Sequence, residues 1–553
     1  MADFIWAQEN ISKISRFNKL YGNNILQPIE NIQIFGIEGT YAYMQKDNNF
    51  ITVLGYCCFP GESIKTTILE IFNDFDESKI SELKKKLIGQ FIIIIKQGFL
   101  IYILGDTWQI RNVFYSKDLK LISSSFSVIE DILGANINKL DSKKVLEYIA
   151  LRHFSYPGWL GNKTIHTDIK CLRPFEYIVI DTSNFNSHIG KICFDINNNK
   201  EHNLNKISSE LITNLKAVIE NPFYKEKKIG ITLTGGCDSR LIATIAANYY
   251  KKASFRIATS KNAYDSLKDA KIAKKIAKAL NIPFRIFTST VDEDLFRKFY
   301  FFSEGLSPKE NSVITPIIEK MGIYALGLGG CFGSEHFISL NQCSNIESFI
   351  DESILKAKSN IQAIEDEWEQ LRFSMLEEFK DIEKHYILSV PNTLDKVRIF
   401  TLLRTAFFSS FMLAAYNIKG LQVEPYNYFK LLEIALKVPE EYIRRGGKYR
   451  NANLVQKKAM LEVSYNIGKI ITTHYQPMLP YTIWTSPYYL RGYLRLFYGK
   501  VINKLKNKYK INHYRKKVTI DNNISYFSDG WDDFFLQRIR ERYGLHVDIT
   551  EMK

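Results

Sequence analysis

The stretch ITLTGGCDSRLIA, residues 231–243, constrains the fold of this chain more than any other of its length. A β-branched apolar run enters two glycines, an acid and a serine, and an apolar helical pattern follows. This order predicts a strand, a tight turn and a helix that begins at the turn. Strand and helix patterns then alternate through SFRIATS, SLKDAKIAKKIAKAL, FRIFTS and YALGLG. Such alternation is typical of a parallel, doubly wound α/β sheet.

The turn after the first of these strands has the chemistry of a phosphate site. Ligands of parallel sheets bind beyond the carboxyl ends of the strands. Gly235 and Gly236 let backbone N–H groups approach a polyanion, and the following helix adds its positive N-terminal end. Thr234 and Ser239 carry hydroxyl donors. Asp238 beside a phosphate requires a cation between them, so the pattern predicts Mg²⁺. A plain glycine turn is the alternative.

The octapeptide LTGGCDSR resembles the pyrophosphate loop of the asparagine synthetase family, whose signature is SGGxDS. Thr234 replaces the first serine, and Arg240 follows the motif. The resemblance implies an ATP pyrophosphatase domain that cleaves ATP between its α and β phosphates. In that family a substrate carboxylate becomes an acyl-adenylate, and an amine then displaces AMP to form an amide. The resemblance also implies that Leu233 flanks the adenosine.

The resemblance continues along the chain. FRIATS is similar to the strand whose end holds the adenine, and Asp269 falls on the family's helix-leading aspartate. Glu304, in FFSEG, stands where the family often has an acid. The segment VEPYNYFKLLEIALKVPEEYIRRGGKYR is similar to the one that carries a catalytic lysine, which would be Lys448, with Arg450 as a substitute. A cation there would stabilise charge that develops on the phosphates. A solvated basic turn is the alternative.

The second loop, LGLGGCFGSEHF, departs from the GxGxDE form of the family. Cys331 stands where an aspartate is expected, and Glu335 comes a few residues later. The resemblance implies that Gly329 contacts the nucleotide. Glu335 would share the metal with Asp238 and, like Glu304, help to deprotonate the amine. The alternative is an altered active site.

Residues 1–195 are rich in strand patterns and resemble the glutaminase-like domain of the same family. Its expected fold is an α+β sandwich of the Ntn-hydrolase type. Such a glutaminase uses an N-terminal cysteine as nucleophile, but residue 2 is Ala2. The first cysteines, Cys57 and Cys58, lie in a strand-like run and are expected to be buried thiols. We therefore predict no glutamine hydrolysis and a scaffold or substrate-binding role for this domain.

The predicted organisation has three parts. The sandwich domain, residues 1–195, is followed by a polar linker and an ATP pyrophosphatase domain at residues 206–480, whose last part is helical. Residues 481–553 form a basic, mainly helical extension. The seven cysteines are scattered without a CxxC pair, and no signal peptide or membrane span is apparent, so a cytoplasmic location is expected.

The net charge of +15 is compatible with a solvated basic surface or with an acidic partner. Basic residues concentrate in LRGYLRLFYGKVINKLKNKYKINHYRKK, which could touch a membrane surface or an acidic protein. No RNA-binding module is recognisable, so nucleic acid is not an expected partner. The oligomeric state stays open.

These observations predict an ATP-dependent, AMP-forming amide ligase that uses ATP and Mg²⁺. Its amine would not come from glutamine. Relatives without the cysteine nucleophile include β-lactam synthetases, lasso-peptide cyclases and polysaccharide-cluster amidotransferases. The carboxylate would therefore belong to a small molecule, a sugar acid of a glycan, or a peptide. Two alternatives remain: a catalytically degenerate homologue that binds ATP or a partner, and a tRNA-modifying ATP pyrophosphatase.

Overall fold

The structure is a computed structural model, and the statements below concern the residues that it describes. These are residues 2–8, 15–22, 24–29, 31–36, 40–154, 161–192, 199–221, 228–250, 254–260, 264–289, 293–307, 314–315, 318, 325–329, 333–337, 345–358, 361–362, 365–386, 390, 393–417, 420–443, 453–472, 478–480, 487, 490, 516–520, 524–528, 533–544 and 547–551.

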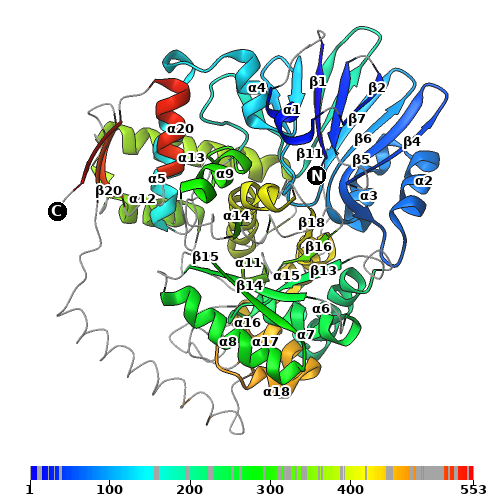
Figure 1. Ribbon diagram of the computed structural model, residues 1–553, viewed down its shortest axis with the longest axis vertical. Helices are drawn as coiled ribbons and strands as arrows, with labels where there is room; N and C mark the ends of the chain where they lie inside the picture. The colour runs from blue at the N-terminus through cyan, green and yellow to red at the C-terminus, as the bar shows by residue number, and fades with distance from the viewer. Residues whose placement is uncertain are drawn as a thin grey trace.

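The N-terminal domain contains two six-stranded sheets in which all neighbouring strands are antiparallel (Figure 1). The first sheet, in the order β10-β8-β9-β1-β3-β2, comprises β1 (Ala2–Ala7), β2 (Ile25–Ile29), β3 (Ile32–Gly36), β8 (Phe114–Ser116), β9 (Leu121–Ser123) and β10 (Ile169–Cys171). The second, in the order β12-β11-β7-β6-β5-β4, comprises β4 (Tyr41–Lys46), β5 (Asn49–Cys58), β6 (Ile88–Gln97), β7 (Leu100–Gly105), β11 (Glu176–Asp181) and β12 (Ser187–Lys191).

The isoleucine run of β6 explains how the two sheets are layered. Ile92 and Ile94 pack in the core between the sheets, together with Phe4 and Ile34 of the first sheet. Their neighbours on β6 face the opposite way, because side chains alternate along a strand. That face packs on α2 (Ile64–Asp74) and α3 (Ile80–Lys86). On the outer face of the first sheet lie α1 (Ser15–Tyr21) and α4 (Phe126–Leu133). The expected α+β sandwich is therefore present as four layers.

The second domain is built on a five-stranded sheet in which every strand pair is parallel. Its order is β15-β14-β13-β16-β18, with β13 (Lys228–Thr232), β14 (Ser254–Ser260), β15 (Phe284–Ser289), β16 (Ala325–Leu328) and β18 (Gly420–Val423). The chain runs outward from β13 to β15, then returns to the other side of β13 for β16 and β18. This confirms the predicted parallel sheet and places a strand switch point between β13 and β16.

Helices surround and extend this sheet. They are α5 (Ser142–Phe154), α6 (Leu204–Ile219), α7 (Asp238–Tyr249), α8 (Tyr264–Leu280), α9 (Glu293–Phe302), α11 (Gly333–Phe337), α12 (Ile346–Lys358), α13 (Glu365–Tyr386), α14 (Thr393–Asn417), α15 (Phe429–Lys437), α16 (Glu440–Ile443), α17 (Leu454–Val463) and α18 (Tyr465–Gly468). No helix in the described ranges is both long enough and apolar enough to cross a bilayer.

Most of residues 481–515, the first half of the predicted helical extension, lie outside the described residues. The described residues of the extension include three strands, β19 (Lys516–Ile520), β20 (Ile524–Ser528) and β21 (Val547–Glu551), which form a sheet with β17 (Ile361–Gln362). Helix α20 (Asp533–Tyr543) lies between β20 and β21 in the sequence. The short β-branched and aromatic runs KKVTI and ISYFS favour strands. These strands form a sheet together with β17, which comes much earlier in the sequence.

Helix α20 fastens the N-terminal domain to the second domain (Figure 1). The guanidinium of Arg538 is buried and donates to Glu130 Oε2 of α4 at 2.5 Å and to the carbonyl oxygen of Glu304, which follows α9. On the same helix, Phe535 stacks on Tyr148 of α5 with ring centroids 3.9 Å apart. One helix thus contacts elements on both sides of the domain boundary.

We expect Arg538→Met to lower the free energy of unfolding by about 3–5 kcal/mol, because it leaves the buried carboxylate of Glu130 with less compensation. Urea unfolding monitored by circular dichroism measures this loss. Arg540→Met is the matched control, since Arg540 lies on the same helix with its side chain exposed. Equal effects of the two substitutions would contradict the role given to Arg538.

Candidate nucleotide site at the strand switch point

The parallel pairing of β13 and β16 brings two loops together. Ile231 is aligned with Leu328, so the residues that follow each strand leave the sheet at the same edge. The first of these loops is the glycine turn that begins at Leu233, whose buried backbone N–H donates to the Arg256 carbonyl oxygen at 3.0 Å. The second begins at Gly329. Crevices at such switch points are where open α/β sheets bind ligands.

The glycine turn is organised by hydrogen bonds among residues that the sequence singled out. The Thr234 N–H donates to Ser239 Oγ at 3.0 Å, and the Gly236 N–H donates to Thr234 Oγ1 at 3.1 Å. The Gly235 N–H donates to Asp269 Oδ1 at 3.1 Å. The structure therefore brings all five residues together. The acceptors are hydroxyl and carboxylate oxygens, which a phosphate oxygen could replace.

Arg240 supports the turn from the protein interior. Its guanidinium is buried and donates to the Gly235 carbonyl oxygen at 2.9 Å and to the Ile470 carbonyl oxygen at 2.5 Å. Burial lowers the pKa of Arg240 to about 10, so it remains charged near neutral pH. By holding the Gly235 carbonyl inward, Arg240 fixes the orientation of the adjoining peptide groups at the start of α7.

Asp238 is the half-buried first residue of α7, and it meets residues from three other segments. Gln456 of α17 donates from Nε2 to Asp238 Oδ1 at 3.0 Å and to the Tyr426 hydroxyl at 3.0 Å. Gly333, the first residue of α11, lies so close that a Cβ there would be 2.7 Å from Asp238 Cγ. The second loop thus reaches Asp238, and a side chain at position 333 would have to displace the Asp238 carboxylate or the Tyr426 ring.

The residues around Asp238 are compatible with the predicted magnesium ion. Mg²⁺ is usually bound through one or two carboxylates together with phosphate oxygens and water, and Asp238 supplies one carboxylate beside the phosphate turn. Glu335 belongs to α11, two residues after Gly333, but its side chain lies outside the described part of the structure. Among the described residues, no group of three or more His, Cys, Asp or Glu side chains could hold a metal ion.

Glu424 is a buried acid at the second loop that the sequence reasoning missed. A Cβ at Gly329 would overlap the Glu424 carboxylate, so this acid packs directly against the end of β16. Gln422 Nε2 donates to Glu424 Oε1 at 2.9 Å. Gly329 itself continues the sheet by donating its N–H to the Val423 carbonyl oxygen at 2.9 Å. The side chain of an acid thus borders the second loop although the GxGxDE motif is absent.

Lys457 of α17 is a second missed residue. Its side chain is buried, and desolvation lowers its pKa to about 8, while the thiol of Cys237 in the glycine turn acts in the opposite direction. A cation therefore lies close to the turn. The signal in the sequence was a lysine three residues before Met460, an apolar residue on the same helix face that is also buried. Lys448, the predicted cation, lies outside the described residues.

The structure does not place Glu304 at the glycine turn. Its carboxylate accepts hydrogen bonds from Ser125 Oγ at 2.9 Å and from the Ser127 N–H at 2.7 Å, at the start of α4. Arg16 lies 3.6 Å from the same carboxylate. Both carboxylate oxygens are thus engaged at a helix N-terminus, where a negative charge is stabilised. Glu304 joins the two domains in this structure.

Cys57 and Cys58 of the N-terminal domain are buried, as predicted. Both are completely inaccessible at the end of β5. Burial raises the pKa of Cys57 well above its ordinary value and raises that of Cys58 to about 12. Asn221 Nδ2 lies 3.1 Å from Cys58 Sγ.

Asn427 connects the N-terminal domain to the edge of the nucleotide site. Its Nδ2 donates to Asp106 Oδ1 at 3.0 Å and to the Gly89 carbonyl oxygen at 2.9 Å, and its Oδ1 accepts from the Trp108 N–H at 3.3 Å. All of these partners belong to the N-terminal domain. Asn427 follows Glu424 by three residues, so the same short segment contacts the second loop and the sandwich.

No protein-family model matches the sequence, and no curated protein is significantly similar to it. Among solved structures, NMN synthetase from Francisella tularensis is similar at 14% identity over 25% of this chain, with a TM-score of 0.17. This chain spans 58% of the length of that synthetase.

Two further solved structures each match 65% of this chain and 78% of their own, with TM-scores of 0.23. One is glutamine phosphoribosylpyrophosphate amidotransferase from B. subtilis complexed with ADP and GMP, at 9% identity. The other is the allosteric regulatory enzyme of purine biosynthesis, at 8% identity. At these TM-scores none of the three likenesses establishes a shared fold or activity.

We expect Cys57 and Cys58 to resist alkylation by iodoacetamide at neutral pH in the folded protein, because the thiolate is the reactive form and burial disfavours it. Peptide mass spectrometry after labelling measures the modified fraction, with urea-unfolded protein as the fully reactive control. Stoichiometric labelling of Cys57 in the folded protein would contradict a purely structural role.

Proposed function

We propose that the protein is an ATP-dependent, AMP-forming amide ligase. The observation that carries the proposal is the turn at the strand switch point, where Thr234 and Ser239 are hydrogen-bonded beside Asp238 and the buried Lys457 interacts electrostatically with Cys237 of the same turn. In the proposed reaction a substrate carboxylate oxygen attacks the α phosphorus of ATP, and pyrophosphate leaves. The nitrogen of an amine then attacks the acyl carbon, and AMP leaves as the amide forms.

Different residues of the site would bind different parts of ATP. The hydroxyls of Thr234 and Ser239 and the N–H groups at Gly235 and Gly236 would bind the pyrophosphate portion. Lys457 would stabilise the charge that develops on it, because a cation in a water-poor site acts strongly on nearby phosphates. Leu233 and the adjoining strand β14 would flank the adenosine.

Asp238 would hold Mg²⁺, which when bound neutralises charge on the phosphate oxygens. Gln456 would keep the Asp238 carboxylate in place, since it donates to Oδ1. Glu335 and Lys448 keep the roles expected from the sequence, as a second metal ligand and a further cation. Glu304 is not included, because its carboxylate is engaged at α4.

The amine would not be produced by glutamine hydrolysis in the N-terminal domain. The thiols of Cys57 and Cys58 are buried, so neither is accessible as a nucleophile. This supports an amine that arrives as a separate substrate or belongs to the substrate that carries the carboxylate. A sugar acid to be amidated, or a peptide or small molecule to be cyclised, fits this chemistry.

A protein that binds ATP without cleaving it is the second candidate. The second loop favours it, because Cys331 stands where the family has an aspartate. Both candidates must also account for the N–H groups of Thr234, Gly235 and Gly236, which already have acceptors within the protein. A phosphate would have to displace these acceptors to use the same donors. Catalysis of ATP–pyrophosphate exchange distinguishes a ligase from a binder.

We expect Asp238→Asn to abolish the formation of AMP and pyrophosphate, because the neutral amide cannot bind Mg²⁺ as the carboxylate does. The assay incubates purified protein with ATP, Mg²⁺ and pools of carboxylic acids, sugar acids and acidic peptides, and identifies the nucleotide product. Asp294→Asn, an exposed change on α9, is the control and is expected to retain activity. Thermal unfolding checks that both variants fold.

Two outcomes would contradict this proposal. Turnover that survives in Asp238→Asn would remove the metal role from this residue. Binding of ATP by the native protein without AMP or exchange in any pool would favour the second candidate.

We expect Lys457→Met to lower kcat for AMP formation by about 10²–10³, the usual cost of losing one group that stabilises transition-state charge. Lys458→Met is the matched control, because Lys458 is the next residue on α17 and its ammonium lies 3.8 Å from Glu462 on the same helix. The control is expected to change kcat little. Equal losses of activity in the two variants would contradict a catalytic role for Lys457 that depends on its position at the glycine turn.

A further inference from the structure

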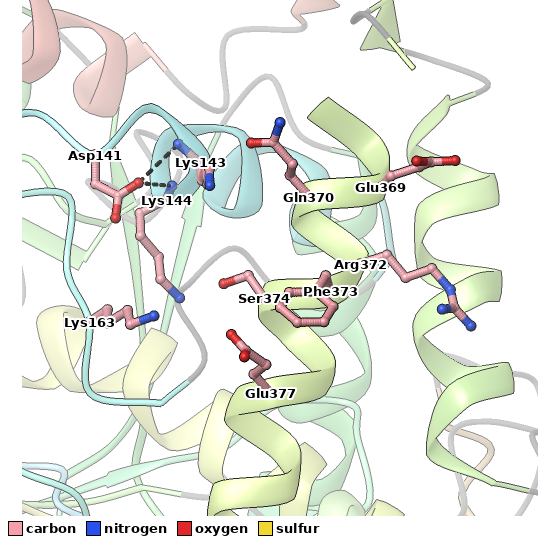
Figure 2. A pocket seen from close by; sticks show the side chains of 10 residues that line it. All are labelled: Asp141, Lys143, Lys144, Lys163, Glu369, Gln370, Arg372, Phe373, Ser374 and Glu377. Carbon is pink, nitrogen blue, oxygen red and sulfur yellow. Dashed lines mark hydrogen bonds between the residues drawn. The ribbon is translucent and has the colours of Figure 1, made fainter. Parts of the chain in front are cut away.

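A groove lies between the N-terminal domain and α13, apart from the nucleotide site (Figure 2). Its volume is about 880 Å³, which is within the range of small-molecule sites. One wall is formed by the start of α5 and by Lys163, and the other wall is one side of α13. None of the residues that line it belongs to the glycine turn or to the second loop.

The floor of the groove is a buried ionic cluster that joins its two walls. Lys144 of α5 is almost fully buried, and its Nζ lies 2.6 Å from Glu147 Oε2 and 2.6 Å from Glu378 Oε1 of α13. Desolvation raises the pKa of Glu378 to about 7 although Lys144 acts to lower it. Separating the members of a buried ionic cluster would leave a buried charge without compensation, which is costly. The cluster therefore holds the two walls of the groove at a fixed position relative to each other.

The two walls present opposite charges to one another. Gln370, Ser374 and Glu377 lie at helical spacing on one face of α13, and Glu377 points toward Lys163 across the groove (Figure 2). Lys143 adds a second ammonium to the Lys163 wall.

Lys163 acts electrostatically on the buried carboxyl group of Glu378, but the charged groups of the two walls form no close ion pairs in the described part of the chain. No ion pair of Lys143, Lys163 or Glu377 lies within 4.0 Å among those residues, although each lines the groove. By contrast, Arg372 of the same groove is paired with Asp351 at 2.6 Å. Asp141 is likewise engaged, since it accepts the Lys143 N–H at 3.1 Å at the start of α5.

We propose that this groove binds a small zwitterion, namely a free amino acid. Lys143 and Lys163 bind its carboxylate, and Glu377 binds its ammonium group. A purely anionic ligand would face Glu377, and a purely cationic one would face the lysines, so each would be repelled by one wall. Ser374 and Gln370, between the charged ends, supply hydrogen bonds. The site is separate from the proposed ligase chemistry and does not depend on it.

The test is isothermal titration calorimetry of the full-length protein with each of the twenty standard amino acids in turn. We expect at least one amino acid to bind. Propionate and ethylamine carry only one charge each, and we expect their affinities to be lower by about tenfold or more. Lys163→Gln and Glu377→Gln should each lower the affinity for the amino acid by about tenfold or more. Lys170→Gln, outside the groove, is the control and should leave affinity unchanged.

Three results would overturn the proposal. The first is that no amino acid binds. The second is that a single-charge analogue binds as tightly as the amino acid. The third is binding that survives both Lys163→Gln and Glu377→Gln. Asp238→Asn separates this site from the proposed ligase: it is expected to bind the amino acid normally even if it loses all ATP cleavage. Loss of amino-acid binding in that variant would place the ligand at the nucleotide site instead.

Discussion

The parallel pairing of β13 with β16 is the interaction on which the candidate site depends. These strands are distant in sequence, yet their hydrogen-bonded register brings the glycine turn and the second loop to one edge of the sheet. The contact between them is close enough that Gly333 has no room for a side chain beside Asp238. A change in the strand order would separate the turn from the second loop, and neither loop alone contains the groups assembled here.

Buried polar residues give this edge its chemical character. Arg240 and Gln456 are completely inaccessible, and Lys457 nearly so. Desolvation makes each of these groups costly unless it is well compensated, and such groups are concentrated at functional sites. Arg240 and Gln456 each hold a part of the turn, through the Gly235 carbonyl and the Asp238 carboxylate. Lys457 adds positive charge where a phosphate would need it.

The N-terminal domain is coupled to this edge by several polar contacts. Asn427 bonds to Asp106 close to the second loop, and Glu304 bonds to the N-terminus of α4. Helix α20 then adds Arg538 and Phe535 at the same boundary. Through these contacts the sandwich forms part of the structure that surrounds the second domain, and the start of α5 with Lys163 provides one wall of the groove at α13.

The sequence by itself determined the elements whose signals are local. The alternation of strands and helices predicted the parallel sheet, and the glycine turn predicted that Thr234, Gly235 and Ser239 lie together, because these features depend on near neighbours. Burial of Cys57 followed from its apolar strand. Lys457 and Lys458 are neighbours with the same charge, and how α17 packs decides that Lys457 is the buried one. Gln456, Glu424 and the groove likewise depend on contacts between distant segments. Local periodicity shows which face of a helix is apolar, but the side chains that meet across an interface are chosen by tertiary packing.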